Sequence, residues 1–206
     1  IDVLKQLSDL YQNDLQKVED YANKLTERVQ SSELIKRKKV EKEFSISALK
    51  DGLERWKTAF DRIEGGNDQA PKFPMPNNYH TQDSAVKNHL DLSLKKMAFG
   101  GIYDQIGGGF SRYSVDKEWK VPHFEKMRYD NAQLISLYSE AYRLDKNELY
   151  EQIVIESIAF SKRELMHTDG IFYSALDADS EGEEGKYYVW KKEELQSILG
   201  EEYQLV

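Results

Sequence analysis

One glycine-rich and aromatic stretch, residues 100–131, constrains the fold of this chain most. It reads GGIYDQIGGGFSRYSVDKEWKVPHFEKMRYDN and holds five of the twelve glycines. Glycine adopts backbone conformations that other residues resist, so its clusters are typical of tight turns and of close backbone approach. Helical patterns precede and follow the stretch. It is therefore either a packed turn between helices, with its aromatic residues in the core, or a loop that binds a polar, ring-shaped molecule.

Apolar residues recur at helical spacing over much of the remaining chain. These stripes predict helices over residues 1–30, 45–63, 81–99, 124–144, 148–166 and 191–199. The first stripe, Leu4 to Val29, predicts a helix packed on its own domain, with a coiled coil as the alternative. The charged residues 31–43 predict a turn or a frayed helix end, and the proline-rich residues 65–80 predict a long loop or a linker.

Two segments near the C-terminal end are rich in residues that favour strands. They are Ile171–Leu176 and Lys186–Trp190, on either side of an acidic, glycine-containing turn. Short β-hairpins are therefore expected near residues 106–121 and 171–190.

The chain also contains an internal echo, by which we mean the same spacing of glycine and aspartate at two places in the sequence. Gly109 is followed seven residues later by Asp116, and Gly170 is followed seven residues later by Asp177. Gly65 stands at the corresponding helix end earlier in the chain. Repeated units of this kind stack to bury a shared face, and their loops collect on one side. The pattern predicts an all-α architecture of antiparallel helix pairs in a ring, with short hairpins at one rim.

Composition excludes several classes of function. The net charge of −8 argues against general nucleic-acid binding, and the absence of cysteine excludes disulfides and zinc–thiolate sites within this sequence. No apolar run reaches the length of a membrane span, and no signal peptide is visible, so we expect a cytoplasmic protein. The acidic turn begins like a calcium loop, but Tyr188 stands where the bidentate Glu is required. We expect no metal and no cofactor.

Three segments of the sequence resemble one known family. They are GGIYDQIGGGFSRYSVDKEWKVPHFEKM with the following YDNA, APKFP at 70–74, and FYSALDADSEGEEGKYYVW at 172–190. They are similar to the YyaL-type family of thioredoxin-domain-containing proteins, which includes spermatogenesis-associated relatives in animals. The resemblance implies a thioredoxin-like domain followed by an (α/α)6 toroid like that of N-acylglucosamine 2-epimerases and six-hairpin glycosidases. Residues 1–206 would be the N-terminal part of one such toroid domain, a partial ring with the thioredoxin-like domain absent upstream.

The resemblance implies a sugar-type pocket, and the matched segments carry suitable side chains. A histidine can transfer protons near neutral pH, carboxylates can accept hydroxyl hydrogens, arginine offers a fork of donors, and aromatic rings can lie against a sugar. The expected catalytic residues are His123, Asp177 and Asp179. The expected substrate-binding residues are Phe110, Arg112, Tyr113, Asp116, Trp119, Glu125, Tyr129, Asp130, Glu181 and Lys186.

Two classes of function follow. The first is a sugar-modifying enzyme, an epimerase, isomerase or glycosidase with a small sugar-like ligand. The second is a non-catalytic module that docks a thioredoxin-like domain or another partner. A broken ring also predicts self-association through the stripes Leu4–Val29 and Ile153–Leu165, because the outermost helices of such a ring have no neighbour to cover them.

Overall fold

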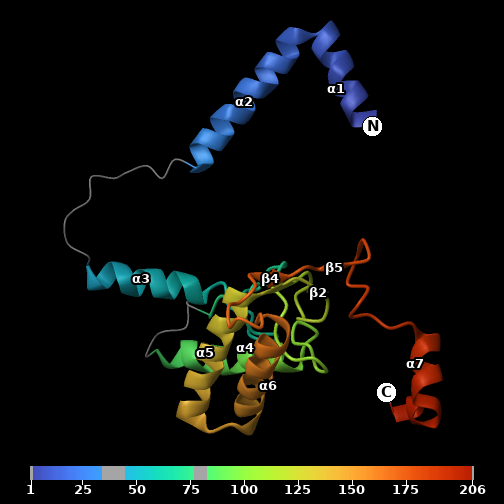
Figure 1. Ribbon diagram of the computed structural model, residues 1–206. Helices are drawn as coiled ribbons and strands as arrows, with labels where there is room; N and C mark the ends of the chain where they lie inside the picture. The colour runs from blue at the N-terminus through green and yellow to red at the C-terminus, as the bar shows by residue number, and fades with distance from the viewer. Residues whose placement is uncertain (1, 34–44, 77–82, 206) are drawn as a thin grey trace. The chain divides into compact units, whose positions relative to one another are not determined.

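The computed structural model describes residues 2–33, 45–76 and 83–205 and divides the chain into two compact units, residues 1–49 and 50–206 (Figure 1). The first unit contains α1 (Asp2–Asn13) and α2 (Leu15–Glu33), and α3 (Ile46–Lys57) crosses the boundary. The expected single helix over 1–30 is therefore two helices. The break falls at Asp14, whose carboxylate accepts a hydrogen bond from the Lys17 amide and so caps the second helix.

The apolar stripe of the first unit faces solvent. Leu4 is 72% exposed and Leu25 is 51% exposed. Within the described residues of this unit, the stripe is not packed on a domain of its own, in contrast to the expectation from its periodicity. Self-association through it stays a prediction. Residues 34–43 of the charge run and the expected helix cap at Thr81 lie outside the described residues.

The second unit is mostly helical, with short antiparallel strand pairs between its helices. Its helices are α4 (Ser84–Phe99), α5 (Arg128–Asp145), α6 (Glu148–Glu164) and α7 (Lys192–Leu199), followed by a 3-10 helix at Gly200–Leu205. The strand pairs are β1 (Tyr113–Ser114) with β2 (Pro122–His123), β3 (Lys126–Met127) with β4 (Ala175–Leu176), and β5 (Asp179–Ser180) with β6 (Glu183–Glu184).

Helices α5 and α6 lie antiparallel and side by side, as predicted for residues 124–166 (Figure 1). Only two residues join them. Lys146 adopts a left-handed conformation with φ of 52°, and the Asn147 side chain accepts a hydrogen bond from the Leu149 amide at the start of α6. The left-handed residue ends α5 and the asparagine caps the start of α6, so the chain reverses its direction within two residues.

The core lies where α4 packs against this pair. It is formed by large apolar and aromatic side chains, among them Leu94, Met97, Leu134, Tyr138, Tyr150 and Ile153. The buried hydroxyl of Tyr138 donates to the Leu94 carbonyl at 2.7 Å, and that of Tyr150 donates to Asp91 Oδ1 at 2.6 Å. Each fully buried side chain of this size contributes about 1.5–3 kcal/mol of transfer free energy, and the hydroxyls lose little because each has an acceptor.

Two loops of the second unit share one structure. FDRIEGGN at 60–67 and YDQIGGGF at 103–110 each begin with an aromatic residue and close with an antiparallel bridge, Phe60 to Asn67 and Tyr103 to Phe110. In each loop the aspartate side chain accepts two backbone N–H groups at 2.8–3.0 Å. Gly65 and Gly66 in the first loop and Gly108 and Gly109 in the second have positive φ, which explains why glycine stands there. The helix expected to run to residue 63 therefore ends at Lys57, before the first of these loops.

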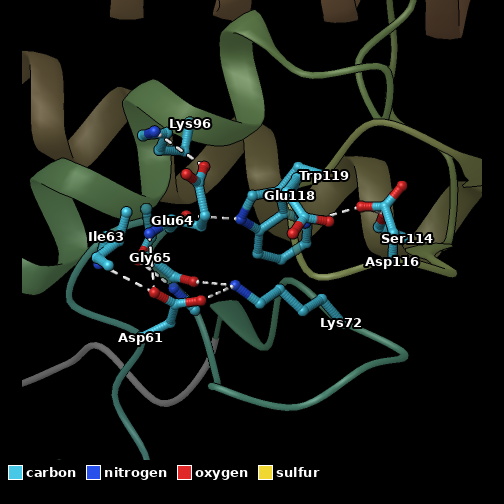
Figure 2. Close-up of polar contacts among 12 residues, drawn as sticks. Asp61, Ile63, Glu64, Gly65, Lys72, Lys96, Ser114, Asp116, Glu118 and Trp119 are labelled. Atoms are coloured by element: carbon cyan, nitrogen blue, oxygen red, sulfur yellow. Dashed lines mark hydrogen bonds and ion pairs between the residues drawn. The ribbon is translucent and has the colours of Figure 1, made fainter.

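A buried lysine holds each loop. Lys72 Nζ donates to Asp61 Oδ2 at 2.7 Å and to the Gly65 carbonyl at 2.8 Å (Figure 2). Lys126 Nζ donates to Asp104 Oδ2 at 2.7 Å and to the Gly108 carbonyl at 3.0 Å. The backbone of each lysine also pairs with the following loop, because Lys72 pairs with Ser114 and Lys126 pairs with Leu176. The long loops therefore meet at one rim of the helices, as the sequence echo predicts.

Three details differ from the sequence expectations. The helix expected from residue 124 begins at Arg128, because residues 126–127 form a strand with residues 175–176. Residues 186–190 form a turn rather than a strand, since the amides of Tyr188 and Val189 both donate to the Gly185 carbonyl. The echo is also one residue out of register. Ser114 and Leu176 occupy matching places, so Asp177 corresponds to Val115 and not to Asp116.

Candidate functional site

A cluster of charged and aromatic side chains lies at the rim where the loops meet. His123 on β2 pairs with Tyr113 on β1, and their rings stack with centroids 4.8 Å apart. His123 Nδ1 lies 2.7 Å from Glu184 Oε1, and His123 Nε2 lies 3.6 Å from Glu125 Oε2. Arg112 Nη1 donates to the same Glu125 oxygen at 3.2 Å. We call Arg112, His123, Glu125 and Glu184, together with Asp130, the rim cluster.

Asp130 brings a carboxyl group to this cluster from the first turn of α5. Its Oδ2 atom is buried and has no hydrogen-bond partner among the described residues. Burial raises the pKa of Asp130 to about 6, and the nearby Arg112 guanidinium opposes that rise. A carboxyl group with this pKa exchanges its proton near neutral pH, which suits general acid or base chemistry.

Tyr129, the residue before Asp130, remains accessible, with 46% of its surface exposed. Its phenol and the Glu125 carboxylate raise the pKa of Arg112, so all three groups share one electrostatic environment. Tyr113, by contrast, stacks on His123 and also contacts the tilted ring of Phe73, whose centroid lies 4.7 Å away. Tyr129 is therefore the aromatic residue of this group that can offer a ring to a ligand.

Two expected substrate-binding aromatics lie in the core instead. Phe110 and Trp119 are both 0% exposed. Phe110 packs against Tyr103 and Tyr138, and Trp119 Nε1 donates to the Glu64 carbonyl at 2.8 Å. Neither ring has a free face for a sugar, so the expected stacking role does not fit them. Their environment is that of packing residues beneath the rim.

Asp116 also has a local role in place of the expected ligand contact. Its carboxylate accepts hydrogen bonds from the amides of Glu118, Lys120 and Val121 and from the Ser114 hydroxyl, the last of these visible in Figure 2. Although partial burial raises the pKa of Asp116, these bonds hold it below its ordinary value. The carboxylate closes the turn between β1 and β2 and has little capacity left for a ligand.

The remaining expected residues lie in the acidic hairpin and do not all join the rim cluster. Asp177 and Asp179 line a pocket of about 330 Å³ together with Asp104, Lys126 and Tyr188. His123 is not part of that lining, so the expected catalytic trio is divided between two places. Glu181 and Lys186 form an exposed ion pair at the hairpin tip. The connection between the two places is Glu184 of the same hairpin, which contacts His123.

Sequence reasoning missed Glu184, Lys72 and Lys126. The two lysines could have been found by aligning FDRIEGGN with YDQIGGGF, which exposes the repeated aspartate that each lysine pairs with. Among the described residues, no group of His, Cys, Asp or Glu side chains is arranged to hold a metal ion. None of the described helices is long and apolar enough to cross a membrane.

Comparison with solved structures defines the class of fold. A cellobiose 2-epimerase from Bacillus thermoamylovorans superimposes with a TM-score of 0.53 at 13% identity, over 69% of this chain and 44% of that one. A sugar epimerase from a ruminal bacterium gives a TM-score of 0.52 at 16% identity, over 63% of this chain and 41% of that one. With its helix pairs and rim hairpins, the second unit is a partial (α/α)6 toroid.

Sequence comparison finds relatives among animal proteins. Human spermatogenesis-associated protein 20 is 44% identical over 160 residues, which cover 69% of this chain and 20% of that protein. An uncharacterized protein of Caenorhabditis elegans is 38% identical over 167 residues, covering 70% of this chain and 22% of that protein. The chain spans about a fifth of the length of these curated relatives. No family model matches the sequence.

Proposed function

We propose that this chain is part of a sugar-modifying toroid domain in a protein of the YyaL-type thioredoxin-domain family, and that it moves a proton on a sugar at the rim cluster. The observation that carries the proposal is the convergence of Arg112, His123, Glu125 and Asp130 within residues 112–130, with Glu184 joining them from the hairpin of β5 and β6. The two solved structures that share this fold are sugar epimerases, which supports a sugar as the ligand.

The geometry gives each residue a distinct task. Glu184 accepts from His123 Nδ1 and so fixes the ring orientation, which leaves Nε2 as the nitrogen that can take a proton from a sugar carbon or hydroxyl. Asp130, with a pKa of about 6, can return or accept a second proton. Arg112 is bound to Glu125 by a single nitrogen, and its other donors are suited to a sugar carbonyl or hydroxyl oxygen.

A proton transfer to or from carbon leaves a direct trace. The chain would be incubated in D₂O with glucose, mannose, N-acetylglucosamine, N-acetylmannosamine and cellobiose, and deuterium at the carbon next to the carbonyl would be followed by NMR. His123→Gln should reduce exchange about 10²–10⁴-fold, the range typical of a lost acid or base. His167→Gln is the matched control, since His167 contacts Asp169 outside the cluster and should leave exchange unchanged.

The outcomes separate the alternatives. Exchange that depends on His123 but not on His167 supports the proposal. Sugar binding without exchange would reduce the domain to a binding module, and exchange that is equal in the wild type and in H123Q would exclude His123 as the acid or base.

A further inference from the structure

The two buried lysines differ in what covers them. Over Lys72 lies the Trp119 indole, with its ring centroid 5.4 Å from Nζ and its N–H bonded to the Glu64 carbonyl (Figure 2). Trp119 is 0% exposed, so the first loop is sealed. The backbone at Trp119 is left-handed, with φ of 62°.

In the second loop the matching position is Glu181. Ser114 and Leu176 pair with the two lysines, and Trp119 and Glu181 each follow five residues later. The backbone at Glu181 is left-handed as well, with φ of 55°. Its side chain, however, is exposed and bound to Lys186 at the surface. The structure therefore repeats the backbone of the first loop but not the indole that closes it.

In the second loop, other side chains make part of the contacts that the Trp119 indole makes in the first loop. The Phe160 and Tyr188 ring centroids lie 4.6 Å and 4.9 Å from Lys126 Nζ. Arg163 Nη2 donates at 2.6 Å to the Gly107 carbonyl, which corresponds to the Glu64 carbonyl that Trp119 holds in the first loop. These groups leave a pocket of about 330 Å³ above Lys126, within the range of small-molecule sites.

The charges of the pocket favour a cation. The two positive groups in its lining are already neutralised, Lys126 by Asp104 at 2.7 Å and Arg163 by Glu164 at 2.6 Å. Asp177 and Asp179 are exposed and have no ion pair within residues 2–33, 45–76 and 83–205. Two carboxylates beside tyrosine rings attract an ammonium group both by charge and through the π faces.

We propose that this pocket binds an amino sugar, which is a pyranose-sized ring that carries an amine. The ring occupies the place that the Trp119 indole fills in the first loop, and the ammonium group lies at Asp177 and Asp179. His123 does not line the pocket. The site is therefore a second one, separate from the rim cluster to which the proposed reaction is assigned.

The internal repeat supplies the test. The Glu181→Trp substitution places an indole at the left-handed position of the second loop that corresponds to Trp119 in the first loop. Binding of glucosamine would be measured by titration calorimetry for the wild type, for E181W and for the matched control Glu183→Trp, which places an indole on β6 of the same hairpin at a position that does not correspond to Trp119. We expect E181W to weaken glucosamine binding at least tenfold and E183W to leave it unchanged.

Charge is tested separately. Asp179→Asn should weaken glucosamine binding about tenfold, and the wild type should bind glucose and N-acetylglucosamine at least tenfold more weakly than glucosamine, because neither has an ammonium group. D179N changes an exposed side chain and is expected to fold normally, so it remains informative even if E181W proves unstable. His123→Gln should keep its affinity for glucosamine, which separates the failure of this proposal from the failure of the proposed reaction.

Three results would overturn the proposal. They are an absence of glucosamine binding to the wild-type chain, an equal affinity of the folded E181W variant, or an equal affinity for glucose and glucosamine.

Discussion

Lys126 Nζ and Asp104 Oδ2 are 2.7 Å apart at the base of the pocket, and only 2% of the lysine side chain is exposed. Burial lowers the pKa of Lys126, and the bond to Asp104 opposes that change. Lys72 makes the same contacts beneath a sealed loop, so the shared role of the two lysines is structural: each ties a glycine turn to the strand that follows it. The pocket above Lys126 adds to this role and does not replace it.

Removal of either lysine should be costly. In Lys72→Met the largely buried Asp61 carboxylate loses its cation, and we expect the free energy of unfolding to fall by about 3–5 kcal/mol, the usual effect of breaking a buried ion pair. Urea unfolding measures it. Lys95→Met, which breaks the exposed pair with Asp91, is the control and should change stability by less than about 1 kcal/mol. A K72M variant as stable as K95M would contradict the structural role.

Two glycines with nearly the same positive φ should respond differently to alanine. Gly109 has φ of 80° and Gly170 has φ of 81°. A Cβ at Gly109 would collide with the Phe160 ring, whereas one at Gly170 would meet nothing within 4 Å. Gly170→Ala should therefore cost only the left-handed strain of about 1–2 kcal/mol. Gly109→Ala should cost about 1–3 kcal/mol more for the overpacked ring, as thermal unfolding would show. Equal losses would mean that the ring moves aside freely.

The pH dependence of stability should report Asp130. Its folded pKa, about 6, lies above the ordinary value of 3.8, so the folded state binds more protons than the unfolded state between these values. Stability should then fall as pH rises from about 4 to 6 and remain constant above. Asp130→Asn removes the cost of the buried charge, so it should be more stable than the wild type at pH 7, by about 1 kcal/mol after allowance for solvent screening, with no gain at pH 4. A gain that is equal at both pH values would point to a cause other than ionisation.

Arg112 should tune that same carboxyl group. Because its guanidinium lowers the pKa of Asp130 against the effect of burial, Arg112→Gln should raise this pKa above about 6. The ¹³C shift of the carboxyl carbon, followed over pH, measures it directly. Arg143→Gln, at the opposite end of α5, provides the matched control and should leave the titration in place. If R112Q does not move the Asp130 titration, the two groups do not form one site.

The helices were predictable because the apolar residues that pack in the core recur at helical spacing along the sequence. The stripes of α5 and α6 face the core through Leu134, Tyr138 and Ile153, as the spacing indicates. The strand pairs were harder, because each has only two residues per strand and β3 pairs with β4 from the far side of two helices. Local β-propensity therefore placed a strand at 186–190, where the chain forms a turn.

The candidate site was predictable only in part. The residues that gather in the rim cluster follow from the matched motif, but sequence cannot distinguish a buried aromatic residue from an exposed one inside a glycine-rich loop. Trp119 and Phe110 were therefore assigned to a ligand although they are buried in the core. The convergence of Asp177 on a pocket apart from His123 depends on the pairing of Lys126 with Leu176, a long-range contact that no local pattern encodes.

The pairing of each lysine strand with the next loop also has a consequence for folding. Lys72 exchanges both backbone hydrogen bonds with Ser114, and the backbone of Lys126 pairs with Leu176, so each of these two lysine segments completes its hydrogen bonding with a later loop. Neighbouring loops must therefore open together, in the manner of a chain of coupled repeats. Amide hydrogen exchange should show this as shared opening: a substitution confined to residues 103–110 should speed exchange at Ser114 and at Arg128, whose amide donates to the Ser174 carbonyl. The rim would then act as one cooperative unit, in which a ligand bound at any loop slows the opening of all of them.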